Sequence, residues 1–153
     1  MPVALGRIPS GLFVITWIEA SRDRGMLASW VMQAGFEPPA ISIAVGKTRG
    51  FLASSDKGSR VVLTLLGESL RPMVARFGRP SVDGFDPFEG ITVSRSPCGL
   101  AILGSTATWL ECSVMNSVDS GDHRVIVASV VCGGAESTVD PPLIHLRKNG
   151  LRY

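Results

Sequence analysis

The sequence is poor in charged residues, cysteine and histidine, and each shortage excludes a class of protein. Charged residues make up only 18% of the 153 residues, and lysine and arginine are scattered. With a net charge of only +2, this distribution argues against a nucleic-acid partner. The three cysteines, Cys98, Cys112 and Cys132, form no CxxC pair and lack the spacing of a zinc site or a disulfide framework. We therefore expect no metal and no nucleic acid.

The sequence also lacks signals for a membrane. No apolar run reaches the roughly 20 residues that a spanning helix needs, and no secretion signal begins the chain. Unpaired cysteines fit a reducing compartment, so we expect a cytoplasmic protein with no membrane partner. Apolar residues make up 45% of the chain, which is long enough for a buried core. We expect a single domain over residues 1–153.

Most of the sequence is typical of β-strands. Valine, isoleucine, leucine and threonine concentrate in short runs between clusters of glycine, proline, aspartate and serine. The runs cover residues 12–18, 40–45, 61–66, 108–118 and 125–131. In the fourth run, Leu110, Cys112 and Val114 alternate with Glu111 and Ser113, which predicts one buried and one polar face.

The last two runs are expected to form a hairpin, because the Asp-Ser-Gly-Asp segment at residues 119–122 favours a turn. The run 125–131 lacks clean alternation, so we expect it to be buried on both faces. Strands joined by turns, without regular alternation with helices, predict a mainly β fold. The expected architecture is a closed antiparallel β-barrel.

One helix is expected between Ser69, a suitable N-cap, and Gly78, which is placed to end it. The apolar residues with helical spacing are Leu70, Met73, Val74 and Phe77. A second, shorter helix is expected from after Thr48 to about Lys57. Residues 80–90 contain glycine, proline and aspartate and are expected to form a surface loop.

A small-residue turn is expected at Gly25, Ala28 and Ser29, directly before Trp30. Ser29 can donate a hydrogen bond to a ring carbonyl or a phosphate, and Trp30 can stack on an aromatic ligand. The alternative is a serine in an ordinary turn beside a core tryptophan. Taken alone, this segment favours the second interpretation.

Lys47, Thr48 and Arg49 follow a predicted strand and open the second predicted helix. A helix N-terminus presents unpaired amides and a positive dipole end, and nearby cations strengthen its attraction for phosphate. The alternative is a solvated turn with a capping threonine. Together with Ser29 and Trp30, this segment offers what a phosphorylated ligand with a flat ring, such as flavin mononucleotide (FMN), requires.

The two histidines, His123 and His145, lack the partners of a known catalytic arrangement. Asp122 precedes His123 and can bias that imidazole toward its charged form. Neither histidine fits a hydrolytic triad or a pair of metal ligands on one helix. Taken alone, each is interpreted as a structural, hydrogen-bonding histidine.

Six segments, in the right order and spread over nearly the whole chain, resemble the flavin reductase-like domain family. They are residues 4–16, 26–31, 36–39, 109–112, 121–123 and 145–148. More narrowly, they look like the C-terminal flavin reductase module of cyanobacterial flavodiiron proteins. The resemblance implies an FMN-binding split β-barrel, Greek-key-like and antiparallel, with one or two short helices. It also implies a homodimer that transfers hydride from NADH or NADPH to a flavin near the subunit interface.

The resemblance further implies which residues bind the flavin, FMN or else FAD. The first segment comprises Met26, Leu27, Ala28, Ser29 and Trp30, and the second comprises Val45, Gly46, Lys47 and Thr48. A C-terminal tail with His145 and Arg147 is expected near the flavin and the nicotinamide. No catalytic acid or base is expected, because the cofactors carry the chemistry and the protein orients them.

Three functions are compatible with the sequence. The preferred one is an NAD(P)H-dependent flavin reductase. The second is a non-catalytic FMN-binding module that passes electrons to a protein acceptor. The third is a cofactor-free split-barrel interaction protein, against which the intact flavin-binding segments argue.

Overall fold

The computed structural model describes residues 1–79, 84–104, 107–135 and 140–151, and most of these residues lie in strands. The strands are β1 (Ser10–Gly11), β2 (Phe13–Glu19), β3 (Arg22–Ala28), β4 (Val31–Phe36), β5 (Pro39–Gly46), β6 (Arg60–Leu65), β7 (Val93–Arg95), β8 (Ala101–Leu103), β9 (Trp109–Ser120), β10 (His123–Gly134) and β11 (Ile144–His145). The α-helices are α1 (Pro2–Gly6) and α2 (Pro72–Gly78), and the 3-10 helices are η1 (Gly50–Ser54) and η2 (Glu68–Leu70). None of the described helices is long and apolar enough to cross a membrane.

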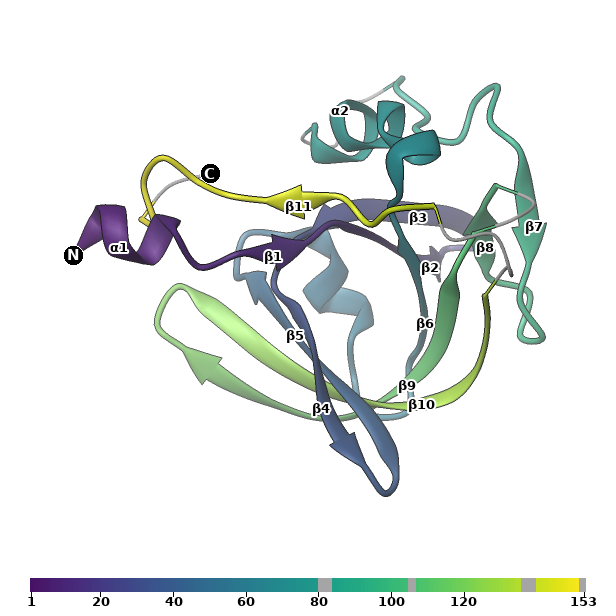
Figure 1. Cartoon of the computed structure of the whole chain (residues 1–153). Coiled ribbons are helices and arrows are strands. Elements are labelled where there is room, and N and C mark those ends of the chain that lie inside the picture. Colours follow the sequence, from purple (N-terminus) through teal and green to yellow (C-terminus); the bar gives the residue numbers. More distant parts are fainter. Residues whose placement is uncertain (80–83, 105–106, 136–139, 152–153) are drawn as a thin grey trace.

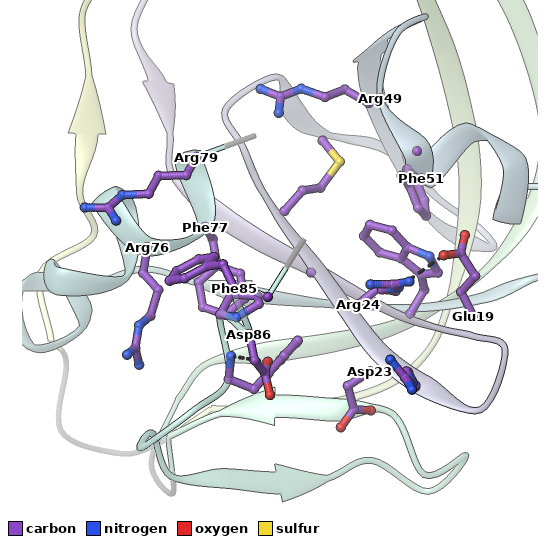
Figure 2. Close-up of a pocket in the computed structure, with 18 residues that line it drawn as sticks. Glu19, Asp23, Arg24, Arg49, Phe51, Arg76, Phe77, Arg79, Phe85 and Asp86 are labelled. Carbon is purple, nitrogen blue, oxygen red and sulfur yellow. Dashed lines mark hydrogen bonds and ion pairs between the residues drawn. The ribbon is translucent and has the colours of Figure 1, made fainter. Parts of the chain in front are cut away.

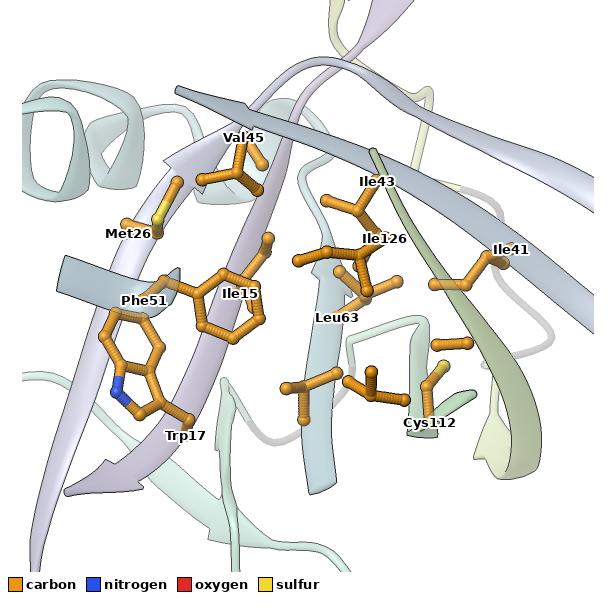
Figure 3. Packing of buried hydrophobic residues seen from close by; sticks show 14 residues of the cluster. Ile15, Trp17, Met26, Ile41, Ile43, Val45, Phe51, Leu63, Cys112 and Ile126 are labelled. Carbon is orange, nitrogen blue, oxygen red and sulfur yellow. The ribbon is translucent and has the colours of Figure 1, made fainter. Parts of the chain in front are cut away.

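Seven strands form one antiparallel sheet in the order β3-β2-β6-β9-β10-β5-β4, which curls around the core (Figure 1). The core contains Ile15, Ile43, Leu63 and Ile126, each from a different strand and each at most 1% exposed (Figure 3). Phe51 of η1 is also fully buried in this core. The predicted antiparallel, mainly β fold is thus confirmed. The expected closure is not seen among the described strands, because β3 and β4 are unpaired edges of the sheet.

All five predicted strands are present, with ends that shift by a few residues. They correspond to β2, β5, β6, β9 and β10. The predicted hairpin between β9 and β10 is also present, and its turn is made by Gly121 and Asp122. Gly121 has a φ of +61°, a conformation that costs glycine little.

The small-residue turn expected before Trp30 is wrong, because Gly25 and Ala28 belong to strand β3. The strand pairs along its whole length with β2 and directs Met26 and Ala28 toward the core. Its charged, glycine-containing sequence resembles a turn, but pairing with β2 determines its conformation. Only Ser29 and Trp30 remain as the link to β4.

Two burial predictions are also wrong. Strand β10 is buried on one face only: Ile126 and Ala128 are fully buried, whereas Val125 and Val127 are partly exposed. Glu111 of β9, expected on a polar face, is only 1% exposed. Its carboxylate pairs with Arg60 at 3.1 Å, so the charge is compensated inside the protein.

The predicted helix after β6 is present as α2, but it begins at Pro72 and not after Ser69. Ser69 lies in η2 and donates from its backbone N–H (3.0 Å) and its hydroxyl (2.6 Å) to Asp140. The second predicted helix is reduced to η1, a 3-10 helix of five residues. Part of the expected loop at 80–90, residues 80–83, lies outside the described residues, and residues 84–90 contain no helix or strand.

Helix α2 covers the outer side of the sheet beside β3 (Figure 1). Phe77 of α2 is buried with Val14, Leu66 and Leu103 in a second apolar cluster. Gly25 of β3 permits this contact, because a Cβ there would lie 2.7 Å from Cε1 of Phe77. The helix and the strand therefore lie against each other at a fixed place.

The two terminal segments run side by side (Figure 1). Strand β11 pairs antiparallel with β1, so that His145 lies opposite Ser10. Beyond this pair, the backbone N–H of Arg147 donates to the carbonyl of Gly6 at 3.0 Å. These bonds hold the C-terminal residues against the barrel.

Candidate functional site

Residues from three separate segments meet around the indole of Trp30. The imidazole of His123 lies with its centroid 4.7 Å from that of the Trp30 ring, at an interplanar angle of 40°. The guanidinium carbon of Arg147 lies 4.8 Å from the Trp30 ring centroid, within the range of a cation–π interaction. We call Ser29, Trp30, Gly46, His123 and Arg147 the Trp30 cluster.

The sheet brings these residues together. The carbonyl of Trp30 accepts a hydrogen bond from the N–H of Ala44 in β5 at 2.9 Å. His123, the first residue of β10, pairs with Gly46 at the end of β5. A Cβ on Gly46 would lie 3.8 Å from Nε2 of His123, so the loop after β5 runs past the imidazole.

Two buried polar atoms of the Trp30 cluster have no hydrogen-bond partner among the described residues. They are the hydroxyl oxygen of Ser29 and Nε2 of His123. An unsatisfied buried polar group costs about 1–3 kcal/mol, so such atoms in a folded protein call for an explanation. A polar ligand that bonds to both atoms is such an explanation.

The other ring nitrogen of His123, Nδ1, lies 2.8 Å from a carboxylate oxygen of Asp122. This hydrogen bond, reinforced by the charge of the imidazole, lowers the pKa of Asp122. The two neighbours are therefore hydrogen-bonded to each other. With Nδ1–H donated to Asp122, Nε2 is the nitrogen that remains available to a ligand.

The loop after β5 presents cations at the edge of the Trp30 cluster. Lys47 pairs with Asp119 at 3.0 Å, and Asp119 also accepts from Arg124 at 2.8 Å. The hydrogen bond from Arg124 and, after it, the one from Lys47 lower the pKa of Asp119. Thr48 is exposed, and Arg49 has no carboxylate partner in the part of the chain that the structure describes.

The expected helix N-terminus at this loop is not formed, because η1 begins only at Gly50 and has five residues. A dipole of such a short helix gives little attraction for an anion. A phosphate at this place would instead depend on the cations of Lys47 and Arg49.

A pocket of about 850 Å³ opens beside β3, between η1, α2 and the segment that follows α2 (Figure 2). We call it the β3 pocket. Its aromatic lining residues are Trp17, Phe51, Phe77, Phe85 and Phe88, and its charged ones are Glu19, Arg22, Asp23, Arg24, Arg49, Arg76, Arg79 and Asp86. Met26 also lines this pocket. Phe85 and Phe88 are the aromatic residues with exposed surface here, and aromatic surface beside charged groups suits a nucleotide-like ligand.

The predicted site residues divide into three groups. Ser29, Trp30, Gly46 and Arg147 meet in the Trp30 cluster, and Met26 lines the β3 pocket. The side chains of Ala28 and Val45 are buried in the core, and Leu27 lies against Gly78 of α2. Lys47 and Thr48 are exposed on the loop, and His145 pairs with Ser10 away from the core.

His123, Arg76 and Arg79 were not among the predicted site residues. The sequence contained a signal for His123, since it stands in the Gly-Asp-His segment at a predicted turn. No sequence signal marked Arg76 or Arg79, because only the packing of α2 against β3 brings them to the pocket. Among the described residues, no three His, Cys, Asp or Glu side chains gather into a group that could hold a metal ion.

Comparisons with known proteins identify the family to which the sequence is similar. The sequence profile of the flavin reductase like domain matches residues 5–150. Diflavin flavoprotein A 1 from Synechocystis sp. is 33% identical over 151 residues, which cover 98% of this chain and 26% of that protein. Diflavin flavoprotein A 3 from Nostoc sp. is 36% identical with the same two coverages. The chain thus spans about a quarter of the length of these curated relatives.

Solved structures share the fold. The styrene monooxygenase flavin reductase from Pseudomonas putida S12 matches 94% of this chain and 90% of its own, with a TM-score of 0.79 and 23% identity. The NADH:FAD oxidoreductase from Streptomyces globisporus covers 98% of this chain and 82% of its own, with a TM-score of 0.81 and 19% identity. These likenesses confirm the predicted split β-barrel.

Proposed function

Because this chain belongs to the flavin reductase like domain family, we propose that it binds FMN and reduces it with NADH or NADPH. The observation that carries the proposal is the pair of buried, unpartnered polar atoms beside Trp30. The Ser29 hydroxyl can donate a hydrogen bond, and Nε2 of His123 can accept one when the ring is neutral. A flavin offers a flat ring, carbonyl oxygens and an N–H, which match these groups.

The β3 pocket supports the proposal by its size and lining. Its volume of about 850 Å³ lies within the range of small-molecule sites, and aromatic side chains line it. Met26 in this pocket and Ser29 in the Trp30 cluster are three residues apart, about 10 Å in an extended chain. The two places therefore lie within the length of one elongated ligand.

When bound, the flavin supplies the chemistry: its ring accepts a hydride from the nicotinamide together with a proton from water. The protein holds and orients the two nucleotides. Lys47 and Arg49 attract the phosphate of the flavin tail. The cation of Arg147, held over Trp30, places a positive charge beside the site and favours negative charge there.

We also propose that the protein acts as a homodimer and can deliver electrons to a protein acceptor. Strand β4 is an edge strand of the main sheet, and Met32 and Phe36 on it are 70% and 84% exposed. Exposed large apolar side chains on a sheet edge favour association with another chain.

The test is a steady-state assay in which the protein, FMN and NADH or NADPH are mixed and the nicotinamide absorbance is followed. We expect consumption of the donor that requires both protein and flavin, and parallel assays with FAD show which flavin is preferred. A rate equal to that of flavin and donor without protein would contradict the proposal.

A further inference from the structure

The charges around the β3 pocket are compensated at one end. Glu19 pairs with Arg24 at 3.1 Å, and Asp23 pairs with Arg95 at 2.7 Å. In Figure 2, Glu19, Asp23 and Arg24 lie together on one side of the pocket. Each lining carboxylate at this end therefore already has a cation beside it.

At the α2 end of the pocket, the cations have no such compensation. Arg76 donates from Nη1 to the backbone carbonyl of Glu89 at 2.7 Å, and the guanidinium of Arg79 lies 5.8 Å from the centroid of the Phe85 ring. Within the described ranges, neither arginine has a carboxylate partner. The third lining acid, Asp86, accepts a hydrogen bond from the backbone N–H of Phe88 at 2.9 Å.

These contacts hold the two arginines without neutralising them. A carbonyl and an aromatic face orient a guanidinium but leave its net charge and several N–H groups for an anion. A planar guanidinium bonds to phosphate oxygens in a fork, so each of these oriented arginines is a suitable phosphate ligand. The neighbouring Phe85, which is 36% exposed, provides apolar surface for an attached ring.

Arg76 and Arg79 lie on a different wall from the loop after β5. Figure 2 shows both beside α2, whereas Arg49 extends from the opposite, η1 side. The pocket thus offers cations on two sides, one for each of two nucleotides.

Resting on the proposed function, we propose that Arg76 and Arg79 bind the phosphate groups of the nicotinamide dinucleotide. The flavin phosphate then lies at the loop after β5, and the two nucleotides enter the β3 pocket from opposite walls. The shared chemistry is a nucleotide phosphate, and the source is either the pyrophosphate of both donors or the additional phosphate of NADPH.

The test compares the double variant Arg76→Ala/Arg79→Ala with the unaltered protein, both reconstituted with FMN. We expect the KM for the donor to rise about tenfold or more, because charge-assisted hydrogen bonds to its phosphates are lost. The kcat and the FMN dissociation constant should stay within about twofold of the values for the unaltered protein. The dissociation constants of NAD⁺ and NADP⁺, measured by calorimetry, should rise by a similar factor. Equal losses for both would assign the pyrophosphate, and a loss for NADP⁺ alone would assign its additional phosphate.

Two controls accompany this test. Arg71→Ala removes a positive charge of the same kind just before α2. Arg71 pairs with Glu68 and does not line the pocket, so its loss should not change nucleotide binding. If the double alanine variant does not fold, Arg76→Lys/Arg79→Lys keeps the charge but not the planar fork and should show an intermediate loss.

Unchanged binding of NAD⁺ and NADP⁺ in the folded variants would overturn the inference. Weaker FMN binding with unaltered donor binding would also overturn it, because the arginines would then hold the flavin. If the unaltered protein binds both nucleotides but does not oxidise either donor, the proposed function fails, and the arginine assignment is still decided by the binding measurements.

Discussion

The guanidinium carbon of Arg147 lies 4.8 Å from the ring centroid of Trp30, although the two residues come from distant parts of the sequence. The antiparallel pair of β1 and β11 brings the C-terminal segment to this place. Because His123 lies on the same indole and pairs with Gly46, the Trp30 cluster joins four segments that are separate in the chain. The fold thereby assembles a polar site around one aromatic ring.

Ser29→Ala should separate ligand binding from stability. The Ser29 hydroxyl has no partner among the described residues, so its removal should leave the free energy of unfolding of the flavin-free protein unchanged or raise it by up to about 1 kcal/mol. The same change should weaken FMN binding about fivefold or more, because the hydroxyl no longer bonds to the ligand. Chemical denaturation and a fluorescence titration with FMN measure the two effects.

Ser55→Ala is the matched control for Ser29→Ala. Ser55 is also buried, but its hydroxyl donates to the carbonyl of Leu52 at 2.9 Å. Its loss should lower stability by about 1 kcal/mol and leave FMN binding unchanged. If Ser29→Ala instead behaves like Ser55→Ala, the Ser29 hydroxyl has no role toward the flavin.

Arg147→Ala should lower turnover with NADH or NADPH more than it lowers flavin content. Loss of the positive charge beside the reacting ring should cost about 1 kcal/mol of transition-state stabilisation, which corresponds to roughly a fivefold loss of kcat/KM. Arg147→Lys should retain part of the activity, since it keeps the charge. Steady-state kinetics and the flavin-to-protein absorbance ratio measure both quantities, and unchanged kinetics in the alanine variant would remove Arg147 from the site.

Glu111 should contribute to a loss of stability in acid. Burial by itself raises the pKa of this carboxyl, but hydrogen bonds from Cys98 and Ser96 and the charge of Arg60 together hold it below its usual value. The folded state therefore binds this proton less readily than the unfolded chain. Its contribution is complete above the unfolded pKa and is lost as the pH falls through the folded pKa.

The measurement for Glu111 is the free energy of unfolding from about pH 6 to about pH 3, in the unaltered protein and in Glu111→Gln. We expect the variant to be less stable by about 1–3 kcal/mol near pH 6, because its amide cannot pair with Arg60 in the same way. The difference should shrink toward low pH. Parallel stability curves over this range would show that Glu111 does not titrate as described.

The strand pattern of the barrel could be predicted because its central strands consist of β-branched and apolar residues. Strand β3 could not, since Gly25 and its charged neighbours favour a turn locally and only pairing with β2 makes them extended. The buried position of Glu111 was equally invisible, because Arg60, which compensates its charge, comes from another strand. Local sequence carries strand propensity but not the partners of long-range contacts.

The candidate site was predictable where its residues stand close together in the chain. Ser29 and Trp30 form one short segment, and the structure brings Gly46 and Arg147 to the same place. That these residues bind a flavin stays a prediction. Arg76 was missed because its role depends on how α2 packs, which no local pattern states.

The most direct test of flavin reduction is the anaerobic absorption spectrum of the FMN-reconstituted protein before and after addition of NADH or NADPH. We expect the flavin band to bleach with about one equivalent of the preferred donor, because one hydride reduces one flavin. A bound flavin whose band persists with both donors would contradict the account and would indicate a module that only transfers electrons.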